Sequence, residues 1–129
     1  MTRFFNKIDV TDLDTALTAK NLKPNTKRVH LATFKNIVYN AINDKKNFDR
    51  PSNTDLNNDI NRKKVIKYID DDVILSSKRQ YISSWETCLK ALNIDIENLK
   101  KEYNRIARIA DDQIQYKKAN EKEQEKEIT

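Results

Sequence analysis

Hydrophobic residues recur at steps of three and four along most of the chain, the spacing that places side chains on one face of an α-helix. Leu31, Phe34, Val38 and Ala41 follow it in one run, and similar runs occur both earlier and later. The pattern predicts an all-α fold, a compact bundle of four to five helices near residues 12–20, 24–43, 60–70, 77–92 and 96–116.

Polar residues mark where these helices begin. Thr11 and Asp14 have the spacing of a capping box, in which two side chains cap backbone N–H groups at a helix start. Pro24 stands where a first-turn proline belongs. Ser76 or Ser77 is the expected cap of the helix near 77–92. The chain has no glycine, so we expect asparagine to take the left-handed positions at helix ends.

Two segments lack an apolar stripe, the row of hydrophobic residues at steps of three and four that marks one face of a helix. Residues 44–58 are polar, with a proline in the middle, and predict a loop that Phe48 fixes to the core. Residues 117–129 alternate lysine with glutamate and predict a charged tail, either a solvated helical extension or disordered chain. We therefore expect one helical domain over 1–116, followed by a tail over 117–129.

One contiguous core is expected from the stripes of these helices. The large apolar side chains assigned to it are Trp85, Phe34, Leu31, Leu89, Ile66, Ile69, Leu99 and Tyr103.

The composition excludes several classes of protein. The absence of glycine argues against β-rich folds and against phosphate-binding loops, which need residues with positive φ. Cys88 is the only cysteine, so no intrachain disulfide can form and a reducing compartment is expected. No apolar run approaches the roughly 20 residues that span a bilayer. We expect an intracellular protein without a membrane partner.

Catalytic and metal-binding residues are scarce. His30 and Cys88 are the only histidine and the only cysteine, too few for a structural zinc site. His30 lies on an apolar stripe and is expected to be partly buried, and nothing near Ser83 or Ser84 suggests a triad. The three acids Asp70–Asp72 suit a magnesium ion or, more simply, a solvated helix end. No enzyme activity, metal or cofactor is expected.

The positive charge is concentrated in the middle of the chain. Residues 20–90 carry fifteen basic and eight acidic groups, a net charge of +7, whereas residues 1–19 and 91–129 each carry −1. Such a segment either forms a basic patch or only solvates its helices.

Two helix starts in this basic segment resemble each other. A shift of 51 residues places Lys27-Arg28 on Lys78-Arg79, Leu31 on Ile82 and Phe34 on Trp85. Amphipathic helices of one length often look alike, so the repeat has a simple structural explanation. The alternative is that both starts face one polyanion.

Residues 22–28 (LKPNTKR), 65–69 (VIKYI) and 75–83 (LSSKRQYIS) together resemble the N-terminal core-binding domain of tyrosine recombinases, or phage integrases. The resemblance covers residues 12–115. It implies a SAM-like bundle of four to five helices that binds one face of duplex DNA. That family's catalytic domain is not matched: Thr33 stands where a His-x-x-Arg motif on His30 would have arginine. The resemblance therefore implies DNA binding and does not imply strand cleavage, and the chain is either a piece of a longer recombinase or a stand-alone relative that binds without cutting.

The DNA contacts are expected at the two similar helix starts. Helix N-termini offer free N–H groups and a positive dipole end to phosphate oxygens. The candidate DNA-binding residues are Lys23, Asn25, Thr26, Lys27 and Arg28 at the first start, and Ser76, Ser77, Lys78 and Arg79 at the second. This hypothesis requires both starts to open onto one continuous basic surface.

A second hypothesis assigns the chain to another class, a helical structural or adaptor protein of a viral particle or multiprotein assembly. Its partner surface is the helix 96–119, whose stripe runs past the length that a small core needs. DNA binding that weakens with salt favours the first hypothesis, and salt-insensitive association with a protein favours the second.

Overall fold

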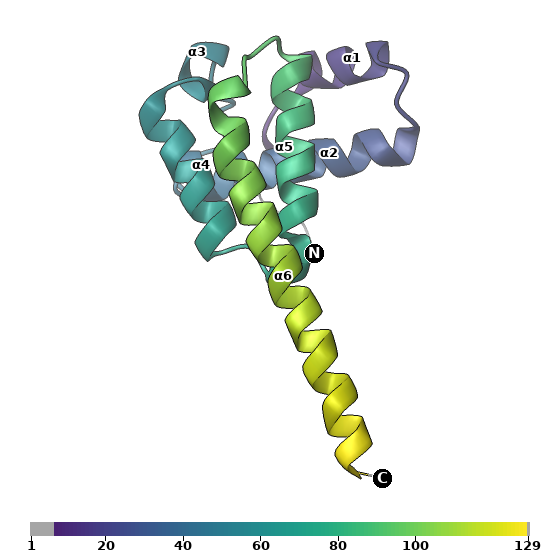
Figure 1. The fold of residues 1–129 in the computed structure, drawn as a ribbon. Helices are drawn as coiled ribbons and strands as arrows, with labels where there is room; N and C mark the ends of the chain where they lie inside the picture. Colours follow the sequence, from purple (N-terminus) through teal and green to yellow (C-terminus); the bar gives the residue numbers. More distant parts are fainter. Residues whose placement is uncertain (1–6, 129) are drawn as a thin grey trace.

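The computed structural model describes the backbone of residues 7–128 and the side chains of residues 7–97 and 99–115. The fold is all-helical, as predicted, with 75% helix and no strand in the described residues. Its elements are α1 (Thr11–Ala19), α2 (Pro24–Ile37), the π-helical turn η2 (Val38–Ile42) that continues α2, α3 (Asn53–Leu56), α4 (Asp59–Asp71), the 3₁₀ turn η3 (Leu75–Ser77), α5 (Lys78–Ala91) and α6 (Glu97–Ile128) (Figure 1).

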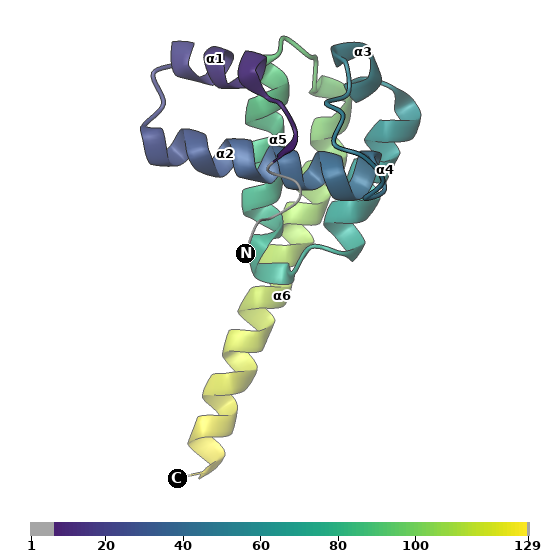
Figure 2. The ribbon, with the colours of Figure 1, turned by 180° about the vertical axis from the view of Figure 1, so that it is seen from behind.

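Helix α5 lies at the centre of the bundle. α2 crosses behind α5 in Figure 1 and in front of it in Figure 2, whereas α6 lies on the other side of α5 in both views. The crossing of α2 and α5 contains a stacked aromatic pair, Phe34 on Trp85, with ring centroids 5.2 Å apart. These two residues are equivalent in the 51-residue repeat, so the repeated helices pack on each other through their matching positions.

The predicted core forms a single cluster of buried side chains. Trp85, Phe34, Leu89, Ile69, Leu99 and Tyr103 are all buried, as predicted. Leu31 and Ile66 are only partly buried and pack against the edge of this cluster.

The helix ends differ from the prediction at two of the three starts with an expected cap. The capping box at Thr11 is wrong. Asp9 takes that place, since its Oδ1 accepts hydrogen bonds from the Thr11 amide (3.0 Å) and the Thr11 hydroxyl (2.6 Å). Ser77 makes no side-chain cap because η3 runs directly into α5. Pro24 begins α2 as predicted.

Asparagine replaces glycine at two helix ends. Asn21 follows α1 with φ 59° and Asn93 follows α5 with φ 61°, as predicted, whereas after η2 the left-handed residues are Asp44 and Lys45, with φ 53° and 63°.

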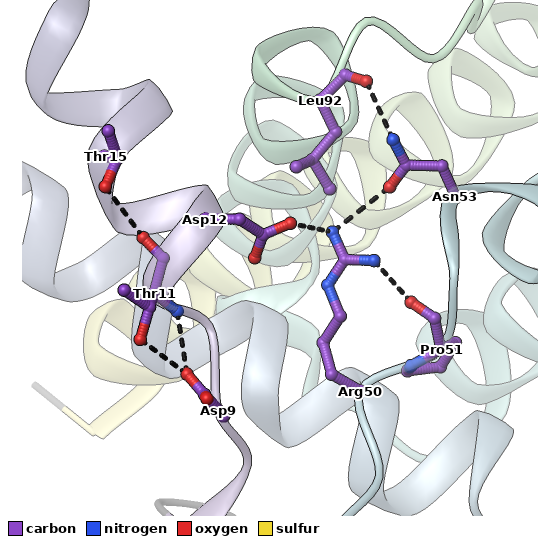
Figure 3. Close-up of polar contacts among 8 residues, drawn as sticks. All are labelled: Asp9, Thr11, Asp12, Thr15, Arg50, Pro51, Asn53 and Leu92. Carbon is purple, nitrogen blue, oxygen red and sulfur yellow. Dashed lines mark hydrogen bonds and ion pairs between the residues drawn. The ribbon is translucent and has the colours of Figure 1, made fainter.

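The segment predicted as a loop contains one turn of helix, α3, which sequence analysis missed. The Ser52 hydroxyl caps it by accepting from the Asp55 amide at 3.1 Å. Arg50 then joins the segment to α1 through a 2.9 Å ion pair with Asp12, and Asn53 donates to the Leu92 carbonyl at 3.3 Å (Figure 3). These contacts hold the segment against the ends of two helices.

Phe48 does not enter the core as expected. It stays 36% exposed and stacks on Tyr39 of η2, with ring centroids 5.5 Å apart and planes at 5°. The loop is therefore attached to the outside of η2.

Helix α6 continues through residues 117–128, so this segment takes the first of its two predicted forms, a helical extension. Both ribbon views show this part of α6 projecting away from the bundle. No helix in the described part of the chain combines the length and apolarity that crossing a bilayer requires.

Candidate nucleic-acid interface

The start of α2 is open to solvent. Lys23 is the N-cap, Pro24 is the first helical residue, and the N-cap makes no side-chain hydrogen bond. Asn25, Thr26 and Arg28 are exposed. First-turn amides have no partner inside a helix, so the N–H groups of Asn25 and Thr26 face water and can donate to an anion.

Lys27 has a different role. Its Nζ lies 2.9 Å from Asp14 Oδ1 and 3.2 Å from the Thr18 hydroxyl, both on α1. The hydrogen bond from Lys27 holds the pKa of Asp14 below its ordinary value, so the pair is ionised at neutral pH. Lys27 therefore fastens α2 to α1.

The start of α5 is engaged by the protein itself. Lys78 Nζ contacts both the carbonyl and, at 3.9 Å, the Oδ1 of Asp70, and only 15% of its side chain is exposed. Arg79 pairs with Asp111 of α6 through Nε (3.1 Å) and Nη2 (2.6 Å). Ser77 donates its amide to the Ile74 carbonyl at 3.0 Å, so that N–H is not free.

Acidic side chains surround this second start. Asp70 and Asp71 end α4, with Asp72 next to them, and Asp111 is followed by Asp112 on α6. The two basic residues of the start are thus compensated by partners from two other helices, which the local sequence does not reveal.

The two starts also face different sides of the molecule. α5 contacts α2 through Gln80, which bonds to Thr33, and through Ser84, which bonds to His30. Arg79 faces α6 instead, on the wall of a hollow of about 370 Å³ between α5 and α6. At 100° per residue, Arg79 lies about 140° around α5 from Ser84.

Arg28 points away from α5 on the other side. It precedes His30 by two residues, about 200° around α2, and it is exposed. Because α5 separates α2 from α6, Arg28 and Arg79 do not share a surface. The expected continuous basic surface across both starts is therefore not found.

A different basic surface follows the outer side of α2. Arg28, Ala32, Lys35 and Tyr39 are spaced by four, three and four residues and form the stripe opposite α5. We name the α2 outer face after this stripe and its flanking lysines, Lys20, Lys23, Lys45 and Lys46. No ion pair within 4 Å is formed by its cations in the described structure.

The α2 outer face lies in a strongly basic part of the chain. Residues 20–46 contain seven basic residues and one acid, Asp44, a net charge of +6, which exceeds the +5 of the whole chain. The neighbouring acids of α1 are occupied, Asp12 by Arg50 and Asp14 by Lys27. The signal was present in the sequence, because residues 20–43 contain no acid, but the search for helix starts overlooked it.

A partly buried polar network, unforeseen in the sequence, joins α2 to α5. His30 Nδ1 lies 2.8 Å from the Ser84 hydroxyl, and Gln80 Nε2 donates to both Ser84 (2.8 Å) and Thr33 (2.9 Å). The Ser84 hydroxyl accepts from Gln80 and keeps both its own hydrogen and a second lone pair, so either tautomer of a neutral His30 ring can pair with it. Burial lowers the pKa of His30, which agrees with a neutral ring.

Two nucleophilic side chains next to this network, Ser84 and Cys88, are buried. Ser84 is 1% exposed, and burial raises the pKa of Cys88 to about 12, so it stays a thiol at neutral pH. The described residues contain no group of three or more His, Cys, Asp or Glu side chains suited to a metal ion.

Comparison with known proteins returned no match in any of three searches, against protein-family models, curated proteins and solved structures. The resemblance to recombinase core-binding domains therefore remains a prediction from the sequence.

Proposed function

We propose that this protein is a non-catalytic DNA-binding module that contacts the backbone of duplex DNA through the α2 outer face. The observation that carries the proposal is the net charge of +6 over residues 20–46, on a helix whose Lys27 alone is ion-paired, with Asp14, while the cations of the α2 outer face form no ion pair within 4 Å among the described residues. The resemblance of residues 22–28 to a DNA-binding domain favours DNA as the polyanion.

The dimensions of this face suit a duplex. Residues 24–42 form α2 and η2, which span about 28 Å at 1.5 Å per residue. A duplex presents one charge per about 1.7 Å of its axis, so several phosphates lie within that length. Lys20, Lys23, Arg28 and Lys35 are the four cations along or beside α2. Four contacts correspond to a slope of about −3.6 in a plot of log affinity against log salt.

Recognition of this kind carries little sequence preference. Lysine contacts and helix-start amides position a protein on phosphates without reading base edges. Arg28 is the one arginine of the face, and it alone has the forked donors that read a guanine in the major groove.

Charge reversal on matched helix surfaces tests the proposal. Lys23→Glu with Arg28→Glu should weaken duplex binding by more than about tenfold at low salt and make its salt dependence shallower. Both changes place acids at the start of α2, where the helix dipole favours them, so folding should persist. Fluorescence anisotropy with a labelled duplex measures the affinity, and circular dichroism checks the helix content.

The matched control lies on α4. Lys63 and Lys67 are exposed and form no ion pair within 4 Å in the described structure. Lys63→Glu with Lys67→Glu changes the net charge equally but lies on the wall of the α4–α6 groove, away from α2. Equal losses in both double variants would show non-specific attraction and overturn the assignment to α2.

The adaptor hypothesis rests on the part of α6 that projects from the bundle. The apolar stripe of α6 from Leu99 through Ala110 packs in the chain's own core, and Ile109, 43% exposed, lies outside it. Residues 115–129 have four basic and four acidic residues and only Tyr116, Ala119 and Ile128 as apolar ones. Deleting residues 117–129 should leave DNA affinity unchanged. Salt-insensitive capture of a protein that depends on this segment would favour the adaptor function instead.

A further inference from the structure

An aromatic pair, the half-buried Tyr39 and the exposed Phe48, lies at the far end of the α2 outer face. The rings of Tyr39 and Phe48 are nearly parallel, with planes at 5° and centroids 5.5 Å apart, and Phe48 is 36% exposed. Lys7 Nζ lies 5.3 Å from the centre of the Phe48 ring. Tyr39 continues the stripe of Arg28 and Lys35, so the pair ends the same row of side chains.

Hydrogen bonds shape the loop that carries Phe48. The Asn43 side-chain amide donates to the carbonyls of Asn47 (3.3 Å) and Asp49 (2.8 Å), which flank Phe48 on both sides. The Tyr39 hydroxyl donates to the Lys45 carbonyl at 3.3 Å. These hydrogen bonds shape the loop backbone alongside the stacking of Phe48 on Tyr39.

The charges around the pair favour an anionic ligand. Lys45 and Lys46 are exposed in this loop, and Lys7 lies at the ring. Asp44 is directed to Lys64 at 3.8 Å, which leaves Asp49 as the other acid of the loop. A flat aromatic surface beside several lysines is the combination that binds unpaired nucleotides, whose bases stack while their phosphates meet the cations.

We propose that Tyr39 and Phe48 form a stacking subsite for one unpaired nucleobase, at the point where a duplex on the α2 outer face ends or opens. This inference rests on the proposed DNA-binding function and extends it from the phosphates to a base. The base lies against the exposed part of the aromatic pair, and the exposed Lys45 and Lys46 of the same loop are the cations for its phosphate.

Two DNA duplexes test the inference, one blunt and one with a single-stranded overhang containing 2-aminopurine, a base whose fluorescence falls on stacking. The full-length protein should quench the probe and should bind the overhang duplex about five- to tenfold more tightly than the blunt one, the gain expected from one stacked base. Anisotropy and probe fluorescence are read on the same samples.

Matched substitutions at Phe48 separate stacking from structure. Phe48→Leu keeps an apolar side chain but removes the aromatic face, and should abolish both the quenching and the overhang preference while leaving blunt-duplex affinity unchanged. Phe48→Tyr keeps the face and should retain both. Quenching that survives in Phe48→Leu, or is lost equally in Phe48→Tyr, would overturn the inference.

The outcomes distinguish this inference from the proposed function. Blunt-duplex binding that depends on Lys23 and Arg28, with no overhang preference and no quenching, refutes the stacking subsite alone. Absence of blunt-duplex binding at low salt refutes the proposed function. If the overhang still quenches in that case, the aromatic pair binds single strands independently of α2.

Discussion

The starts of α2 and α5 look alike in sequence but differ in their surroundings. Each has a basic pair, Lys27-Arg28 or Lys78-Arg79, followed by the same apolar spacing. At α2 one member of the pair, Arg28, is exposed and forms no ion pair within 4 Å in the described structure, whereas at α5 both members bond to aspartates of other helices. Similar local sequence therefore does not give similar availability to a ligand.

The difference arises from what packs beside each helix. α2 borders α1, whose acids near the contact are taken up by Lys27 and Arg50. α5 lies between α2 and α6, and its start meets Asp70 at the end of α4 and Asp111 on α6. The start of α5 thus has both of its basic residues paired inside the fold, while the start of α2 has Lys27 paired and Arg28 exposed to solvent.

Removing the aromatic contact between α2 and α5 should have the largest effect on stability. Trp85→Ala removes a 2% exposed ring that stacks on Phe34 and should destabilise the protein by about 3–5 kcal/mol, a large share of a small domain's stability. Chemical denaturation followed by circular dichroism measures the loss. A cost below about 1 kcal/mol would mean that α2 and α5 do not depend on this contact.

Arg28 and Arg79, which are equivalent in the 51-residue repeat, test whether only the start of α2 contacts DNA. Arg28→Gln should make the salt dependence of duplex binding shallower by about 0.9 in slope, because one phosphate contact is lost. Arg79→Gln, with the same change in charge, should leave the slope unaltered, since Arg79 is on the α6 side of α5. Equal effects would show that both starts contact DNA, contrary to the placement described.

Most of the fold could be predicted from the sequence because it follows from local periodicity. The stripes through Phe34 and Trp85 located the long helices, and Pro24 and the Asp70–Asp72 run located two of their ends. The capping of α1 was missed because Asp9, two residues ahead of Thr11, competes for the same amide. The single turn α3 is too short to show a periodic stripe.

The candidate site was less predictable because it depends on partners distant in sequence. The sequence around Arg79 does not predict its pairing with Asp111, which is 32 residues away. The sequence around His30 likewise does not predict its contact with Ser84, which is 54 residues away. The basic character of α2 could be read directly, since it needs only the absence of acids over residues 20–43.

The polar network between the two helices should make stability depend on pH. Burial lowers the pKa of His30 below its ordinary 6.5, so the unfolded chain binds the proton more tightly than the folded one. Stability should therefore be full above pH 6.5 and should decline as the pH falls through and below that value. Thermal unfolding from pH 7.5 to 5.5 should show this decline in the wild type and a smaller one in His30→Gln. The same decline in both would assign it to other groups.

Removing the ion pair between Arg79 and Asp111 should have the smallest effect on stability and DNA affinity. Asp111→Asn removes its ion pair, while Asp112→Asn changes the same charge at an exposed neighbour that forms no ion pair within 4 Å in the described structure. Exposed ion pairs contribute little to stability, so the unfolding midpoint should be nearly equal in the two variants. Their duplex affinities should also be equal, because the freed arginine faces the α5–α6 hollow and not the α2 outer face. If instead Asp111→Asn binds more tightly and its salt slope steepens by about 0.9 relative to Asp112→Asn, then Arg79 reaches a phosphate once released. In that case Asp111 masks a second DNA contact. The two helix starts would then differ because Arg79 is paired with Asp111, and not because Arg79 lies on another side of the molecule.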